Sequence, residues 1–147
     1  MALDPSNVGR EFASAEPYLV GREKVREFAT ATGETSPLCH DVLAARAAGY
    51  ADVVAPTTFP IVVTLNAMGE AVTDPSVGVD WSRVVHGDQR FSYTRPIVAG
   101  DELTVRTVIE SVRSLAGNDM ITLRGDLLDG TGTHIGSTWT SLVQRAV

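Results

Sequence analysis

The 147-residue sequence has one cysteine, three histidines and twelve basic residues against eighteen acidic ones. The single cysteine, Cys39, excludes an internal disulfide bond, and a lone cysteine is more often a small apolar filler than a nucleophile. The formal net charge of −6 argues against a nucleic-acid surface, because phosphate binding needs clustered Lys and Arg. The widely spread His and Cys residues match no metal-ligand spacing, and the sequence has no phosphate-binding loop, dinucleotide fingerprint or nucleophile elbow. We therefore expect no metal and no other cofactor.

Long apolar runs and a leader segment are also lacking. No apolar run reaches the ~20 residues that cross a membrane, and Met1–Gly9 lacks the basic and apolar regions of a signal peptide. The contents of 44% hydrophobic and 20% charged residues are ordinary for a globular domain. These features predict a single domain over residues 1–147, placed in the cytoplasm, with no membrane or nucleic-acid partner.

One long, almost uncharged stretch, Ala55–Val72, predicts a buried central helix. Apolar residues fall on nearly every side of a helix drawn over it, so something larger must enclose it. Pro60 suits a first helical turn, and the helix is expected to begin at Thr57 or Thr58. With Thr57 as the N-cap, its hydroxyl would accept the Phe59 N–H and leave the Thr58 N–H free.

Two shorter helices are expected before this stretch. In Gly21–Thr32 the apolar residues recur at helical spacing, and Gly33 suits a C-cap. Glu34–Pro37 is then expected to be a loop, because the residue before proline avoids the helical region. A second helix is predicted over Asp41–Ala48, starting near its first residue or at His40.

After Val72 the sequence changes to strands separated by turn-forming residues. Alternating apolar residues predict four strands, with a β-bulge near Thr107 in the second: Gln89–Ile97, Glu102–Val112, Met120–Leu128 and His134–Val143. Several antiparallel strands after one apolar helix predict an α+β fold in which a curved antiparallel sheet wraps around that helix. One sheet cannot also seal the ends of the helix, so we expect a second subunit that pairs through the sheet edges.

Three segments resemble the hot-dog fold and, within it, the MaoC-like dehydratases and (R)-specific enoyl-CoA hydratases: Gly33–His40, Ala55–Phe59 and Phe91–Leu103. More narrowly, the chain is similar to an N-terminal-type subgroup that includes accessory subunits of (R)-3-hydroxyacyl-ACP dehydratases in mycolic-acid-type fatty acid elongation. The resemblance implies an acyl-CoA or acyl-ACP thioester as the ligand. It also implies a dimer, either a homodimer or a heterodimer with a catalytic MaoC-like subunit.

Active members of this family carry a Gly-Asp-x-Asn-Pro-(aliphatic)-His segment, whose Asp and His act on one catalytic water. Adding water across an enoyl thioester requires an acid and a base on the same face of the substrate. Here Glu34 occupies the Asp position, Ser36 the Asn position and Cys39 the His position, and His40 comes one residue later. The resemblance therefore gives Glu34 and His40 as candidate catalytic residues in a degraded segment. The alternative is that Glu34 is a solvated loop acid and that His40 begins a helix.

The resemblance also implies a role for the start of the central helix, which in the family faces the thioester carbonyl. Backbone N–H groups and the helix dipole there stabilise developing enolate charge. The candidate substrate-binding residues are Thr57, Thr58 and Phe59, with plain capping as the alternative. Asn66, farther along the helix, either contacts the ligand or is a satisfied core amide.

Two other features have less specific patterns. His86 and Asp88 offer a second acid–base pair, but their place just before a strand favours a turn or an interface. Trp81 and Trp139 are expected to be packing residues.

The principal hypothesis is an acyl-thioester-binding subunit of a (R)-3-hydroxyacyl-ACP or -CoA dehydratase in fatty acid metabolism, needing a catalytic partner that carries the intact Asp and His. Three alternatives stay open: a self-sufficient homodimeric enoyl-CoA hydratase using Glu34 and His40, a hot-dog thioesterase using a carboxylate such as Glu34 or Glu70, and a non-catalytic homodimer that binds acyl-CoA. The sequence leaves open the acyl chain length, the carrier, the identity of the second subunit, and whether the lone chain is an enzyme.

Overall fold

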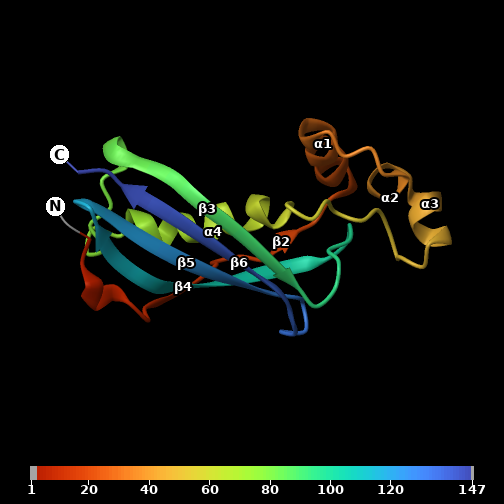
Figure 1. The fold of residues 1–147 in the computed structure, drawn as a ribbon. Coiled ribbons are helices and arrows are strands. Elements are labelled where there is room, and N and C mark those ends of the chain that lie inside the picture. The colour runs from red at the N-terminus through yellow and green to blue at the C-terminus, as the bar shows by residue number, and fades with distance from the viewer. Residues whose placement is uncertain (1–2, 147) are drawn as a thin grey trace.

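A computed structural model describes residues 3–146 as six antiparallel strands that curve around one long helix, α4 (Pro60–Thr73) (Figure 1). The sheet has the order β1-β4-β5-β6-β3, and β2 pairs with β4. The strands are β1 Glu11–Ala13, β2 Tyr18–Leu19, β3 Val84–Tyr93, β4 Glu102–Leu115, β5 Asn118–Leu128 and β6 His134–Gln144. No helix within residues 3–146 is long and apolar enough to span a membrane. The arrangement confirms the predicted α+β fold with a sheet around the apolar helix.

One stripe of α4 lies at the centre of the core. Buried residues recur every third or fourth position, the spacing of one helix face: Pro60, Val63, Thr64, Ala67, Met68, Ala71 and Val72. All of them except Pro60 and Thr64 belong to clusters with apolar residues of β4 and β5, including Leu103, Val105, Ile109, Ile121, Leu123 and Leu127. Gly125 lies under the helix, where an added Cβ would stand 3.0 Å from the Met68 methyl carbon. A glycine therefore permits this close approach of helix and sheet.

The opposite face of α4 is not covered by other residues of the described range 3–146. Leu65 is 54% exposed, and Asn66 and Glu70 are exposed as well. The expected enclosure of the helix on all sides is therefore met on one side only within a single chain. Asn66 is a surface residue and not a core amide.

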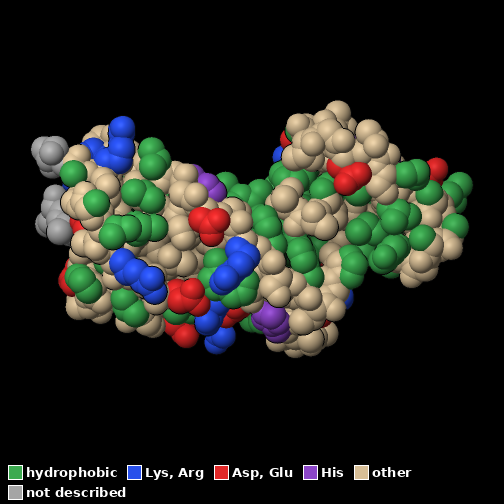
Figure 2. Space-filling model, viewed as in Figure 1, with side chains coloured by type: hydrophobic (Ala, Val, Ile, Leu, Met, Phe, Trp, Pro, Cys, Tyr) green, Lys and Arg blue, Asp and Glu red, His purple; other side chains and the backbone are tan. Residues whose placement is uncertain are grey.

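Three helices form a lobe beyond the N-terminal end of α4 (Figure 1 and Figure 2): α1 Arg22–Thr32, α2 Pro37–His40 and α3 Val42–Ala47. α1 ends as predicted at Gly33, whose left-handed backbone (φ 75°) suits glycine. The rings of Phe28 and Phe59 meet edge to face with centroids 5.5 Å apart. Arg22 donates two hydrogen bonds to Asp52, at 2.8 and 2.7 Å. These two contacts tie α1 to the chain that leads into α4.

The short helix α2 lies partly in the segment for which the sequence predicts a loop. Pro37 suits its first turn, and the Ser36 hydroxyl accepts the Leu38 N–H (3.3 Å). Asp41 caps α3 as predicted, because its carboxylate accepts two backbone N–H groups of that helix at 2.7 and 3.3 Å. His40 therefore ends one helix and does not begin the next.

Two β-bulges account for part of the difference between the predicted and the observed strands, and the first predicted strand ends at Tyr93 and not at Ile97. β3 begins at Val84, earlier than predicted, and its register shifts between His86 and Asp88. This shift interrupts the alternation of side chains between the two faces of the strand. The two-residue sequence pattern that predicts a strand is therefore missing from the first part of β3. The predicted bulge in β4 exists, but it lies at Glu110 and not near Thr107.

Candidate functional site

α4 begins at Pro60, after a tight turn, and not at Thr57 or Thr58 as the sequence predicts. The Phe59 N–H donates to the Pro56 carbonyl (2.9 Å), and no side chain caps the helix. The Phe59 side chain is fully buried, and this burial fixes the turn where a side-chain cap is missing. The predicted capping role of the Thr57 hydroxyl is therefore wrong.

The turn presents a backbone donor to solvent. Thr57 and Thr58 are exposed, and within residues 3–146 no protein group accepts the Thr58 N–H. The Tyr93 phenol donates to the Thr57 carbonyl, and partial burial raises the pKa of this phenol to about 12. The N-terminal end of a 14-residue helix adds positive electrostatic potential. Together these groups can stabilise negative charge on a carbonyl oxygen.

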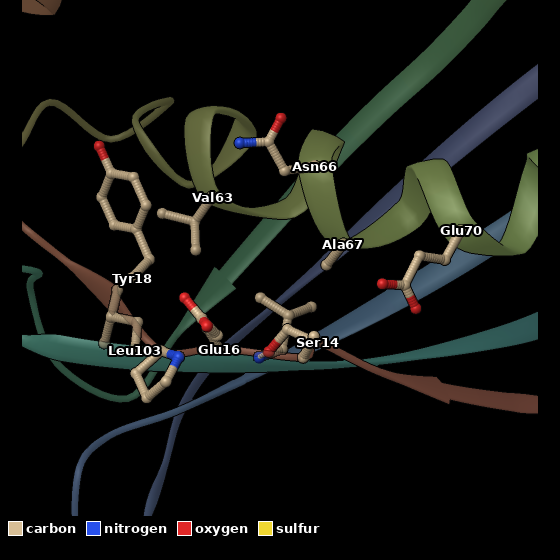
Figure 3. A pocket seen from close by; sticks show the side chains of 11 residues that line it. Ser14, Glu16, Tyr18, Val63, Asn66, Ala67, Glu70 and Leu103 are labelled. Atoms are coloured by element: carbon tan, nitrogen blue, oxygen red, sulfur yellow. Dashed lines mark hydrogen bonds between the residues drawn. The ribbon is translucent and has the colours of Figure 1, made fainter.

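A cleft of about 210 Å³ lies between α4 and the β1–β2 and β4 segments (Figure 3). We call its apolar residues the cleft floor: Val63, Ala67, Leu103 and Val105. Polar groups form its rim, including Ser14, Glu16, Tyr18, Asn66 and Glu70. Figure 3 shows Glu70 reaching from α4 toward the sheet, whereas Asn66 points away from the cleft floor. The cleft therefore combines an apolar interior with a polar, partly acidic edge.

The loop between β1 and β2 is the part of this cleft that sequence reasoning missed. Its residues carry only proline punctuation and one brief strand-like run, with no motif that indicates a site. Pairing with β4, for example the 2.9 Å bond from the Ser14 N–H to the Val105 carbonyl, places the loop beside α4. Of the four predicted substrate-binding residues, Asn66 lines the cleft, whereas Thr57, Thr58 and Phe59 form the turn before α4.

Glu34 and His40 contact each other through the Glu34 backbone carbonyl and not through the Glu34 carboxylate. His40 Nε2 lies 2.7 Å from the Glu34 carbonyl oxygen, and the Glu34 carboxylate accepts the Ser36 N–H at 2.8 Å. The His40 carbonyl in turn accepts from Arg26 Nε (2.9 Å). Both candidate side chains are half-buried on the lobe and already engaged by their own segment. A catalytic water would have to compete with these bonds.

Cys39, which the sequence resemblance places at the position of a family histidine, is a buried thiol. Burial, and to a lesser degree the Glu34 charge, raises the pKa of this thiol, so it remains protonated near neutral pH. This fits the expected apolar filler. Within residues 3–146, no three His, Cys, Asp or Glu side chains are grouped as a metal site requires.

His86 and Asp88 lie inside β3 and not before it, on either side of its bulge. Both are exposed, and the His86 ring contacts the Gln89 amide oxygen at 3.2 Å. Trp81 is 53% exposed, so its expected packing role is not met among residues 3–146. Trp139 is half-buried, where the Arg90 guanidinium stacks 4.2 Å from its ring centroid.

The amino-acid sequence matches the family model of the FAS1-like dehydratase domain region over residues 6–136. Relatives that carry the name UPF0336 protein include one from Streptomyces avermitilis, 56% identical over 99% of this chain and 97% of its own length. Another, from Clavibacter michiganensis, is 51% identical over 99% of this chain and 97% of its own length.

Solved structures of related proteins share this fold. A MaoC-like dehydratase superposes with a TM-score of 0.89 at 34% identity, over 97% of this chain and 43% of that one. The C-terminally truncated HadBC (3R-hydroxyacyl-ACP dehydratase) complex from Mycobacterium tuberculosis superposes with a TM-score of 0.87 at 30% identity, over 97% of this chain and 99% of that one. The chain thus spans less than half the length of the first protein and nearly all of the second. It therefore belongs to the FAS1-like dehydratase family of MaoC-like hot-dog proteins.

Proposed function

We propose that this chain is the acyl-thioester-binding subunit of a (R)-3-hydroxyacyl-ACP or -CoA dehydratase in fatty acid metabolism. The observation that carries the proposal is the cleft beside α4, whose apolar floor suits an acyl chain. The turn that leads into the same helix exposes the Thr58 N–H. A thioester carbonyl bound there would meet both this donor and the positive end of the helix dipole.

The catalytic acid and base would come from a partner subunit. Dehydration needs two proton-transfer groups that reach one face of the substrate. In this chain the Glu34 carboxylate is bonded to the Ser36 N–H, and the His40 ring is bonded to the Glu34 carbonyl. Displacing a catalytic group by about 1 Å can lower the reaction rate ~100-fold. In addition, Cys39 occupies the position at which the family resemblance places the catalytic histidine.

A second hot-dog subunit would cover the free edge of β3 and the uncovered face of α4. An apolar hollow of about 290 Å³ lies between them, with Leu65, Trp81 and Val84 among its walls. Among the described strands, β3 pairs only with β6, and Val85 on it is 45% exposed. A long unpaired edge beside exposed apolar residues favours strand pairing with another subunit. The HadBC structure, similar to this chain, is itself a complex, which supports a partner.

Hydration of crotonyl-CoA tests this assignment. The purified chain is expected to bind a saturated acyl-CoA saturably, yet to hydrate crotonyl-CoA no faster than its His40→Ala variant. Adding a MaoC-like subunit with the intact Asp and His is expected to give more hydration than the sum of the two alone. Robust hydration by the lone chain that His40→Ala abolishes would establish the self-sufficient hydratase instead.

A thioesterase is the second candidate, favoured by the position of Glu70. Its carboxylate reaches from α4 toward the sheet (Figure 3) and has no ion-pair partner within residues 3–146. Water activated by this carboxylate would release free thiol from an acyl-CoA, whereas hydration releases none. The dehydratase proposal expects no thiol release, and release that Glu70→Gln abolishes would select the thioesterase.

A further inference from the structure

Tyr93, the last residue of β3, lies against the turn that leads into α4. Its phenol donates to the Thr57 carbonyl, which joins the end of an edge strand to the segment before the helix. Its cross-strand partner is Gly136, where an added Cβ would stand 2.7 Å from the Ser92 carbonyl oxygen and 3.6 Å from the Tyr93 ring. The ring therefore packs directly on sheet backbone, which restricts where its hydroxyl can point.

Fixing the Thr57 carbonyl also fixes the next N–H group. The Thr57–Thr58 peptide is trans, and a planar trans peptide points its C=O and N–H in opposite directions. When the Tyr93 hydroxyl binds the carbonyl, the Thr58 N–H must point away from it. The Thr58 N–H has no acceptor within residues 3–146, so it remains available as a donor for a ligand.

Few other bonds hold this peptide in place. The neighbouring peptides are fixed by the bond from the Phe59 N–H to the Pro56 carbonyl (2.9 Å) and by the bond from the Ile61 N–H to the Thr58 carbonyl (3.2 Å). The Thr57–Thr58 peptide between them is exposed, and within residues 3–146 the Tyr93 phenol alone bonds to its carbonyl. Without that bond the peptide could rotate and aim its carbonyl oxygen, instead of its N–H, at the ligand.

We propose that Tyr93 is a positioning residue, which orients the Thr57–Thr58 peptide so that the Thr58 N–H donates to the carbonyl oxygen of a bound acyl thioester. This inference rests on the proposed function and adds the residue that prepares the donor. The phenol keeps its proton across the neutral pH range, because partial burial raises its pKa to about 12. The donor is therefore oriented before the ligand arrives, which lowers the cost of binding.

Two ligands and two variants test the proposal by calorimetric titration of the full chain. The ligands are a saturated acyl-CoA and the matched alkyl-CoA thioether, in which a CH₂ group replaces the carbonyl. Tyr93→Phe is expected to weaken acyl-CoA binding by about fivefold to tenfold, the value of one hydrogen bond, and to leave the thioether affinity unchanged. Tyr50→Phe, which removes the same hydroxyl from a tyrosine in the lobe, is the matched control and should change neither affinity.

The outcomes separate this proposal from the proposed function. If the unaltered chain binds neither ligand, the acyl-thioester function fails. If it binds both equally, the carbonyl receives no donor and the role of Tyr93 is overturned while acyl binding stands. An equal loss of both affinities in Tyr93→Phe would show a merely structural residue, and no loss of either would also overturn the proposal.

Discussion

Two of the junctions at which the chain enters a helix, those before α2 and α4, differ in how their polar groups are bonded. At the entry to α2, Glu34 accepts the Ser36 N–H and its carbonyl contacts the His40 ring. At the entry to α4, the Thr57 carbonyl is held by Tyr93 while the Thr58 N–H remains open. The polar groups of the first junction are bonded to one another, whereas the second leaves a donor open at the start of α4, the helix that also lines the apolar cleft. The open donor is the reason that we propose the second junction, and not the first, as the site for a carbonyl ligand.

Proline accounts for part of this difference. At the entry to α2, Pro37 follows a serine whose hydroxyl caps the helix. At the entry to α4, Pro56 and Pro60 lack N–H groups, and Phe59 is turned into the core. The donors left between these prolines have no side-chain cap to satisfy them.

The largest expected effect comes from removing the anchor of the second junction. Phe59→Ala deletes a fully buried ring that packs edge to face on Phe28, so the free energy of unfolding should fall by about 3–5 kcal/mol. Denaturant unfolding measures this loss. Thr57→Ala, two residues earlier and exposed, should stay within about 0.5 kcal/mol of the unaltered chain. A loss below 1 kcal/mol for Phe59→Ala would mean that the turn is held by something else.

Filling the cleft should remove acyl binding without disturbing the first junction. Ala67→Phe places a ring over the cleft floor and would displace at least two methylenes of the acyl chain, each worth ~0.8 kcal/mol when buried. Affinity for a saturated acyl-CoA should therefore fall by about tenfold or more. Ala47→Phe, an equal enlargement at an exposed position of α3, should leave it unchanged. Unaltered binding by Ala67→Phe would place the acyl chain elsewhere.

A smaller effect is expected at the first junction. His40→Ala removes one hydrogen bond within the lobe and should cost about 1 kcal/mol of unfolding free energy. Affinity for a saturated acyl-CoA should change by less than about twofold, because the ring is bonded to its own backbone. Titration of the variant measures this. A tenfold weaker affinity would show that His40 contacts the ligand, so that the entry to α4 would not be the only junction at the ligand.

The smallest effect concerns the ion pair that tethers the lobe. The Arg22 hydrogen bond and charge lower the pKa of Asp52 from 3.8 to about 2, opposed in part by desolvation. A lowered pKa stabilises the fold above pH ~4, and this stabilisation is lost as the pH falls toward ~2. The thermal midpoint of the unaltered chain should therefore fall more steeply across that range than that of Asp52→Asn. Parallel curves for the two proteins would show that this tether adds nothing to stability.

Local patterns in the sequence were enough for most of the fold. The existence of the helix α4, the C-cap at Gly33 and the N-cap at Asp41 depend on local composition and near-neighbour chemistry, and all three appear in the structure. The start of α4 did not follow local rules. Burial of Phe59 outweighed the capping preference of Thr57, and that burial depends on a residue in α1.

The candidate site was predictable only in part, because its walls come from distant segments. The β1–β2 loop reaches the cleft through pairing with β4, and Tyr93 reaches Thr57 across 36 residues of sequence. No local pattern marks either contact. Glu34 and His40 were predicted only as candidate catalytic residues, and the bond of the His40 ring to the Glu34 carbonyl depends on the turn that Ser36 and Pro37 create.

The most direct test of the account is an amide NMR titration of the nitrogen-15-labelled chain with a saturated acyl-CoA. If the ligand carbonyl binds at the entry to α4, the Thr58 amide signal should shift saturably while the amides of Glu34 and His40 stay in place. Saturable shifts at Glu34 and His40, with none at Thr58, would contradict this claim and would place the ligand carbonyl at the entry to α2.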